Sequence, residues 1–128
     1  MSKLRVLVVA DCDSLRRSLV LLLTGKIDVA GAVASRLMLD AVAEVDPEVV
    51  ICSVRTPLAG REPESLWSRP VPAKPFVFVT TLTLDVGEWL DFGKVCVVNE
   101  QDLHQDLLAA VQAAAAGEIY LSRRAVRF

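Results

Sequence analysis

Two kinds of apolar pattern alternate along the chain. Five short runs are apolar at nearly every position, at residues 4–9, 29–33, 49–53, 76–80 and 95–98. Runs of this length without polar alternation are typical of strands buried on both faces, as in a parallel sheet covered by helices. Between most of these runs, apolar residues recur every three or four positions, which is the spacing of one helix face. The pattern therefore predicts five βα units in a three-layer α/β sandwich.

Three of the helical segments have clear faces and ends. The first is expected to end at Gly25, and its apolar face holds Leu15, Leu19, Leu22 and Leu23. The second is expected to end before Pro47, and its face holds Met38, Ala41, Val42 and Val45. The last helix should end at Gly117. Asp102 can cap its N-terminus, and Gln105, three residues later, can complete a capping box with it. Its predicted inner face holds Leu103, Leu107, Leu108, Val111 and Ala115.

The third and fourth helices are predicted to be short or irregular. The segment 63–75 leaves room only for a short helix near residues 64–68, because it contains Pro63, Pro70, Pro72 and Pro75. The segment 81–93 contains Gly87 and permits about two or three helical turns at most.

Composition places the chain among ordinary globular domains. Its 128 residues suffice for one domain with a core, and a net charge of −2 with 53% hydrophobic residues argues against disorder and against general attraction to nucleic acid. No apolar run approaches the roughly 20 residues of a membrane helix, and a signal-peptide cleavage region is lacking, so we expect no membrane contact and a cytoplasmic location. Cys12, Cys52 and Cys96 lack zinc-site spacing and should be reduced thiols; no metal or cofactor is expected.

The most informative polar residues stand where the predicted strands end. The carboxyl ends of parallel strands meet at one edge of a sheet, where ligand and catalytic sites of open α/β folds are built. At that edge the sequence places Ala10 and Asp11 after the first strand, Ser53 after the third, Thr80 after the fourth and Asn99 after the fifth.

The segments that carry these residues resemble the receiver domain of a bacterial two-component response regulator, over nearly the whole chain. They read VLVVAD at 6–11, PEVVICSVRTPLAG at 47–60 and FVTT at 78–81, in the order of that family. GEIYLSRRAV at 117–126 resembles the end of receivers in the subfamily with a LuxR-type helix-turn-helix DNA-binding module. The resemblance implies a flavodoxin-like (βα)5 fold with a parallel sheet of strand order 2-1-3-4-5, and with the first and fifth helices on one face.

The family's phosphorylation site is only partly present. In that family an acidic pair holds magnesium, an Asp after the third strand accepts a phosphoryl group, and a Thr or Ser and a Lys respond to it. The resemblance places the acidic pair at Ala10 and Asp11, the acceptor at Ser53, the hydroxyl at Thr80 and the lysine at Asn99. Magnesium prefers carboxylate ligands, and no His or Lys base is placed to activate Ser53. These five positions are therefore interpreted as a degenerate phosphorylation site without catalytic residues.

The predicted function follows from that loss. The sequence indicates a non-enzymatic, atypical receiver domain at residues 1–117, which regulates transcription without phosphorylation. Residues 118–128 are predicted to begin a linker toward a DNA-binding module absent from this chain, through which alone DNA would be bound. We expect a homodimer whose interface lies on the first and last helices and includes Leu15, Leu19, Leu108 and Gln112.

Two alternatives stay open. The emptied site could bind a small molecule in a candidate pocket formed by Asp11, Ser53, Thr80, Trp89, Cys96 and Asn99. Ser53 could instead still accept a phosphoryl group. Trp89 should either pack over the core or form a wall of the pocket, and the three cysteines are expected near this same edge as inert packing residues. A nucleotide-binding loop is disfavoured, because ADCDSL at 10–15 has no glycine and two acidic groups.

Overall fold

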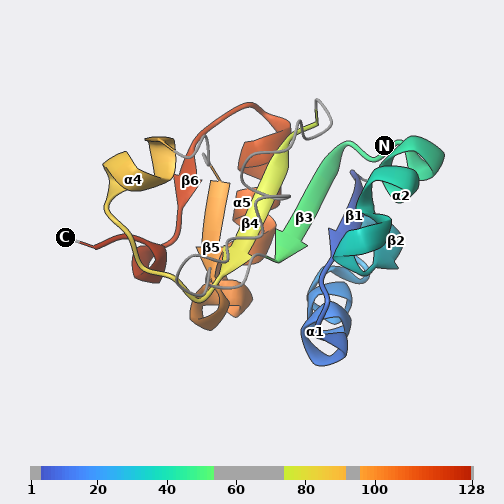
Figure 1. Cartoon of the computed structure of the whole chain (residues 1–128), viewed down its shortest axis with the longest axis horizontal. Helices are drawn as coiled ribbons and strands as arrows, with labels where there is room; N and C mark the ends of the chain where they lie inside the picture. Colours follow the sequence, from blue (N-terminus) through green and yellow to red (C-terminus); the bar gives the residue numbers. More distant parts are fainter. Residues whose placement is uncertain (1–3, 54–73, 92–95, 128) are drawn as a thin grey trace.

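One parallel sheet runs through the molecule. The computed structural model describes residues 4–53, 74–91 and 96–127, and within them six strands pair in the order β2-β1-β3-β4-β5-β6 (Figure 1). The strands are β1 (Arg5–Val9), β2 (Asp28–Val33), β3 (Val49–Ser53), β4 (Phe76–Thr80), β5 (Cys96–Asn99) and β6 (Tyr120–Leu121). Every neighbouring pair is parallel, so all strands end at the same edge, called here the carboxyl edge.

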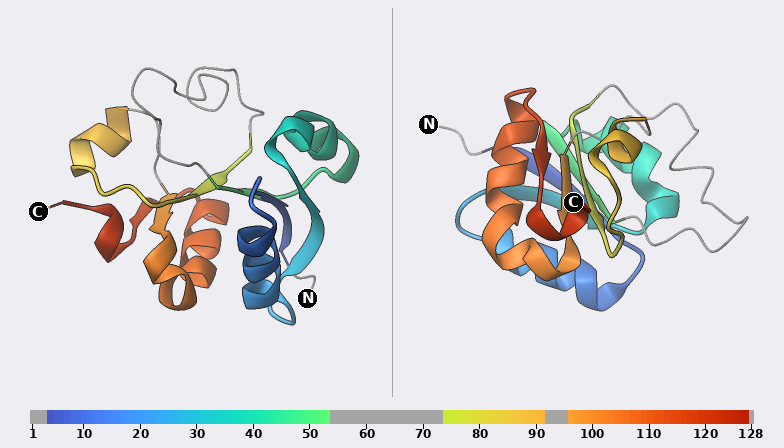
Figure 2. Two further views of the ribbon diagram at one scale, coloured as in Figure 1. Left: turned by 60° about the horizontal axis from the view of Figure 1, so that its bottom comes forward. Right: turned by 90° about the vertical axis from the view of Figure 1, so that its left-hand side faces the viewer.

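Helices cover both faces of this sheet. α1 (Asp13–Leu23) and α5 (Leu103–Ala115) lie on one face, whereas α2 (Met38–Val45) and α4 (Val86–Asp91) lie on the other, as the left view of Figure 2 shows. Three short 3-10 turns complete the described elements: η1 (Ser35–Leu37), η2 (Glu100–Asp102) and η3 (Arg123–Ala125). The sequence-based prediction of a three-layer sandwich with strand order 2-1-3-4-5 is confirmed. The expected short fourth helix is also confirmed, while the predicted third helix falls outside the described residues.

Each strand contributes alternate side chains to two cores. Val8, Ile51 and Val79 point toward α1 and α5, and their neighbours along the strands point toward α2 and α4. All but one residue of β1 are fully buried, as are Val49, Val50, Ile51 and Cys52 of β3. This two-sided burial explains why the strands read as continuous apolar runs in the sequence.

Two details of the helices differ from the sequence prediction. In α5 the buried stripe is Leu103, Leu107, Ala110, Val111 and Ala114, so Ala115 is exposed and Leu108 is only half-buried. Asp102 precedes α5, but its side chain makes no capping hydrogen bond to the helix. It binds Arg124 instead, so the predicted capping box with Gln105 is wrong.

The chain after α5 belongs to the sheet. Gly117 ends the helix with a φ of +76°, a conformation that glycine adopts without strain. The following residues then form β6, whose Tyr120 pairs with Cys96 of β5. Ser122, Ala125 and Val126 are buried. The predicted boundary at residue 117 is therefore too early, because the fold continues to the end of the described tail.

The Tyr120 hydroxyl fastens this tail to α5 by donating a hydrogen bond to Asp106. That hydrogen bond, with a smaller contribution from burial, raises the pKa of Tyr120 to about 12. The phenol is thus a permanent donor near neutral pH.

Candidate functional site

The carboxyl edge brings together the five residues that the sequence singled out. Ala10 and Asp11 follow β1, Ser53 ends β3, and Thr80 and Asn99 face each other across β4 and β5 in register. Ala10, Thr80 and Asn99 are buried, Ser53 is half-buried and Asp11 is exposed. The predicted juxtaposition of strand ends is therefore present, and its chemistry depends on what each side chain contacts.

Asp11 is bound to the segment after β2. Its Oδ1 accepts a hydrogen bond of 2.8 Å from the backbone N–H of Ser35, at the start of η1. The Ser35 hydroxyl lies 2.8 Å from Oδ2, so both carboxylate oxygens have a partner within the chain. Asp11 thus caps η1, a role the sequence did not suggest.

A guanidinium group lies at the end of β1. Arg16 Nη1 donates a 2.7 Å hydrogen bond to the backbone oxygen of Ala10, and Nη2 pairs with Asp13. Arg16 therefore binds the end of β1, and Asp13 balances its positive charge. The apolar Ala10 side chain itself packs in the core between β1 and the α1–α5 face.

The Asn99 carboxamide joins three segments at the other end of the edge. Nδ2 donates to the backbone oxygens of Leu82 (3.3 Å) and Arg124 (3.2 Å), and Oδ1 accepts from the N–H of Gln101 at 3.0 Å. Thr80 Oγ1 accepts a hydrogen bond of 3.1 Å from Leu82 N–H in the same loop. Asn99 is thus a structural residue that holds these segments together.

Residues 122–127 close over the β4–α4 loop, an arrangement we call the tail clamp. Trp89 Nε1 donates a 2.7 Å hydrogen bond to the backbone oxygen of Ala125, which also accepts from Leu84 N–H at 3.0 Å. The Thr83 hydroxyl donates to the Arg124 carbonyl at 2.7 Å, and Arg127 N–H donates to Leu84 O at 2.9 Å. Trp89 is only 1% exposed, so the clamp is also packed against the core.

A buried carboxylate anchors the clamp to α5. Asp102 is 2% exposed, and its Oδ1 lies 2.6 Å from Arg124 Nη1 while Oδ2 accepts from Arg124 N–H at 2.9 Å. Burial opposes ionisation of Asp102, but these hydrogen bonds, one from Ser122 and the charge of Arg124 outweigh it. The pKa of Asp102 therefore lies below its ordinary value.

The residues at the carboxyl edge do not fit a magnesium ion. The family's ion needs carboxylates from the first and third strands. Here those positions offer the methyl group of Ala10 and the hydroxyl of Ser53, and both oxygens of Asp11 already bind Ser35. Across the described residues, no group of three or more acidic, His or Cys side chains could hold a metal.

Two members of the predicted ligand pocket were misplaced. Cys96 is the first residue of β5 and pairs with Tyr120, so it lies at the opposite end of the strand from Asn99. The three cysteines therefore do not share the carboxyl edge. Burial raises the pKa of the Cys96 thiol, partly offset by a backbone hydrogen bond at Tyr120. Trp89 lies in the core beneath the clamp, which confirms core packing over a pocket wall.

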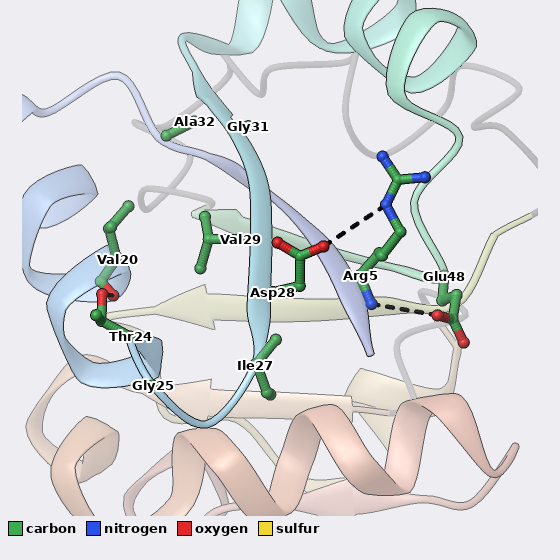
Figure 3. Close-up of a pocket in the computed structure, with 10 residues that line it drawn as sticks. All are labelled: Arg5, Val20, Thr24, Gly25, Ile27, Asp28, Val29, Gly31, Ala32 and Glu48. Atoms are coloured by element: carbon green, nitrogen blue, oxygen red, sulfur yellow. Dashed lines mark hydrogen bonds and ion pairs between the residues drawn. The ribbon is translucent and has the colours of Figure 1, made fainter. Parts of the chain in front are cut away.

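A hollow of about 760 Å³ lies away from this edge, between the end of α1 and β2 (Figure 3). Near the clamp, a second hollow of about 540 Å³ is lined by Thr81, Thr83, Asn99, Glu100, Gln101, Arg124 and Val126. Asn99 is its only member from the predicted ligand pocket. Neither of these two hollows brings the predicted pocket residues together.

Two predicted interface residues are core residues. Leu15 and Leu19 point from α1 into the sheet and are 9% and 0% exposed. Leu108 is half-buried and Gln112 is exposed on α5. The apolar face of α1 was thus wrongly assigned to an interface, because the same periodicity marks any face that packs on a sheet.

We predict that Asp102→Asn destabilises the fold at neutral pH, by about 1 to 3 kcal/mol, because the neutral amide cannot keep the charge-assisted bonds to Arg124. The folded pKa of Asp102 is lowered, so its contribution is present above an unfolded pKa of about 3.9. It is lost as pH falls through the folded pKa.

The difference in melting temperature between the wild type and the Asp102→Asn variant should therefore shrink below about pH 4. Asp40→Asn, on the exposed side of α2, is the matched control and should change stability by less than about 0.5 kcal/mol. A difference that persists undiminished into acid would contradict the ionised pair.

This chain is similar to known proteins in its structure. No protein-family model matches the sequence. No curated protein matches it either. The isolated REC domain of RcsB from Salmonella enterica serovar Typhimurium, solved with phosphomimetic BeF3-, is similar in structure with a TM-score of 0.72 and 16% identity. That match covers 97% of this chain and 96% of the REC domain.

Longer RcsB chains give the same result. An RcsB–DNA complex matches with a TM-score of 0.75 and 16% identity over 97% of this chain, and RcsB from Salmonella typhimurium matches with 0.74 and 16% over 98%. This chain spans 66% of each of these RcsB chains. At such identity the likeness establishes the fold, and the chain has the fold of a response-regulator receiver domain.

Proposed function

We propose that this chain is the atypical receiver domain of a transcription regulator, and that it controls dimerisation of a DNA-binding module without being phosphorylated. One observation carries the proposal: Asn99 stands at the lysine position and binds Leu82 and Arg124, which ties the tail to the β4–α4 loop. A phosphorylation-driven switch needs that loop to change its arrangement. Here the loop is held by contacts that require no phosphoryl group.

The direction of the tail supports a DNA-binding module that follows it in sequence. The described tail runs beside the β4–α4 loop, where Val126 bridges to Leu84, and Arg127 is exposed. Similar RcsB chains are about half as long again as this chain, and structures of RcsB include a complex with DNA and dimers bound to DNA. We infer that a DNA-binding module follows the clamp and takes its orientation from it.

The domain is proposed to act by association and not by catalysis. Ser53 has a hydroxyl but no described His or Lys beside it to remove the proton, and a neutral serine is a weak nucleophile. The ligand-sensing alternative has less support, because Asp11, Thr80, Trp89 and Asn99 are occupied by partners within the chain.

Restoring the acceptor alone should not restore phosphorylation. Ser53→Asp supplies a carboxylate, but Ala10 offers no metal ligand and Asn99 no positive charge to the phosphoryl oxygens. We expect no labelling of this variant by acetyl phosphate with magnesium, measured by intact mass. The triple variant Ala10→Asp, Ser53→Asp and Asn99→Lys should be labelled. Rapid labelling of the single variant would mean that a working metal site survives.

The protein should be dimeric without any phosphodonor, because its carboxyl edge already has a fixed arrangement. Sedimentation equilibrium at tens of micromolar should show a dimer whose mass does not change when acetyl phosphate and magnesium are added. A monomer under these conditions would contradict the proposed function. A dimer that forms only with acetyl phosphate would contradict phosphorylation independence in particular.

A further inference from the structure

The outer edge of β2 carries unpaired backbone. β2 ends the sheet, and within the described part of the chain it pairs only with β1 (Figure 1). Asp28 N–H donates to Leu4 O, and Val33 O accepts from Ala10 N–H, so the backbone at both ends of β2 faces β1. Because such groups alternate along a strand, those of Val29, next to Asp28, and of Ala32, next to Val33, face outward, and the register shift at Ala30 breaks the alternation between them. These groups can accept another strand.

The side chains of this edge do little to protect it. Residues 29–33 read Val-Ala-Gly-Ala-Val, without a charge or a proline, which are the usual devices that block pairing. The register shifts between Val6 and Leu7 and leaves Ala30 without a partner on β1. This bulge limits the length of a new ladder. Side-chain contacts beside β2 must therefore contribute to any association.

An apolar hollow lies beside the edge, on α1. Leu21 is 73% exposed, the largest value among the exposed large hydrophobic residues of the described chain. Together with Val20 and Ala32 it lines a hollow of about 330 Å³, which Arg16 and Arg17 border. A leucine this exposed next to an open strand is a contact that a partner can bury.

Charged side chains stand at both ends of the edge. At the amino end of β2, Asp28 and Glu48 flank Arg5, with Asp28 Oδ2 3.8 Å from Arg5 Nε and Glu48 accepting from Arg5 N–H at 3.2 Å (Figure 3). At the other end Arg16 is paired with Asp13, whereas Arg17 is exposed and forms no ion pair among the described residues. Asp28 at one end and Arg17 at the other are thus exposed side chains of opposite charge.

We propose that this edge surface, formed by β2 with Arg17 and Leu21 of α1, binds a second copy of the chain in antiparallel orientation about a two-fold axis near Gly31. Only that orientation brings Asp28 of each copy toward Arg17 of the other. The outward groups of Val29 and Ala32 pair with the same strand of the partner, and each Leu21 packs against the partner's hollow.

This surface would be the interface of the dimer that the proposed function requires, so the inference rests on that proposal. It replaces the predicted interface on α1 and α5, two of whose residues are buried. It also leaves the tail clamp, at the far end of the sheet from β2, free to carry the following module (Figure 1).

Charge reversal tests the arrangement. In a dimer of the Arg17→Asp variant, Asp28 of each copy faces the new aspartate of the other copy. In a dimer of the Asp28→Lys variant, Arg17 of each copy faces the new lysine of the other copy. Each variant should dimerise about tenfold or more weakly than the wild type in sedimentation equilibrium. An equimolar mixture of the two variants should form a heterodimer, because each Asp then meets a cation. Native mass spectrometry distinguishes the heterodimer by mass.

Arg123→Asp, an exposed reversal on η3 at the other end of the sheet, is the matched control and should dimerise like the wild type. If both edge variants dimerise like the wild type, the surface is wrong while the proposed dimer stands. If both are monomeric and the mixture stays monomeric, the antiparallel arrangement is wrong. If the wild type itself is monomeric, the proposed function and the surface both fail.

Discussion

The carboxamide of Asn99 is the contact on which the carboxyl edge of the sheet depends. It is 5% exposed and joins the β4–α4 loop, the start of α5 and the tail through Leu82, Gln101 and Arg124. A carboxamide combines two donor hydrogens with an acceptor, whereas a lysine ammonium can only donate. Loss of any partner would leave a buried polar group unsatisfied. The three segments are therefore held in one arrangement that a lysine could not reproduce.

Other polar side chains at this edge also have hydrogen-bond or ion-pair partners within the chain. Asp11 binds Ser35, Thr80 accepts from Leu82, and Asp102 is neutralised by Arg124. A site that responds to a phosphoryl group keeps carboxylates and a cation available for the ion and the phosphoryl oxygens. Among the described residues of the edge, such groups are either missing or used as structural partners, and this agrees with the proposal of a domain that has one arrangement.

Much of the fold could be predicted from sequence, because local patterns determine it. Strands buried on both faces gave continuous apolar runs, and α1 ends at Leu23 just before Gly25, which has a φ of +86°. Long-range polar contacts could not be predicted. Asp102 and Arg124 are 22 residues apart, and nothing local indicates that this carboxylate binds the tail instead of capping α5. The exposed Leu21 was also missed, because the apolar periodicity of α1 points to its buried face.

The central claim is that the carboxyl edge neither binds a phosphoryl group nor changes its arrangement in response to one. The most direct measurement is an amide NMR titration of the ¹⁵N-labelled protein with beryllofluoride and magnesium, a phosphoryl mimic. The account predicts that the amide resonances of Asp11, Ser53, Thr80, Asn99 and the tail clamp stay where they are. Saturable shifts at Ser53 and Thr80 that spread to Asn99 and residues 122–127 would contradict it.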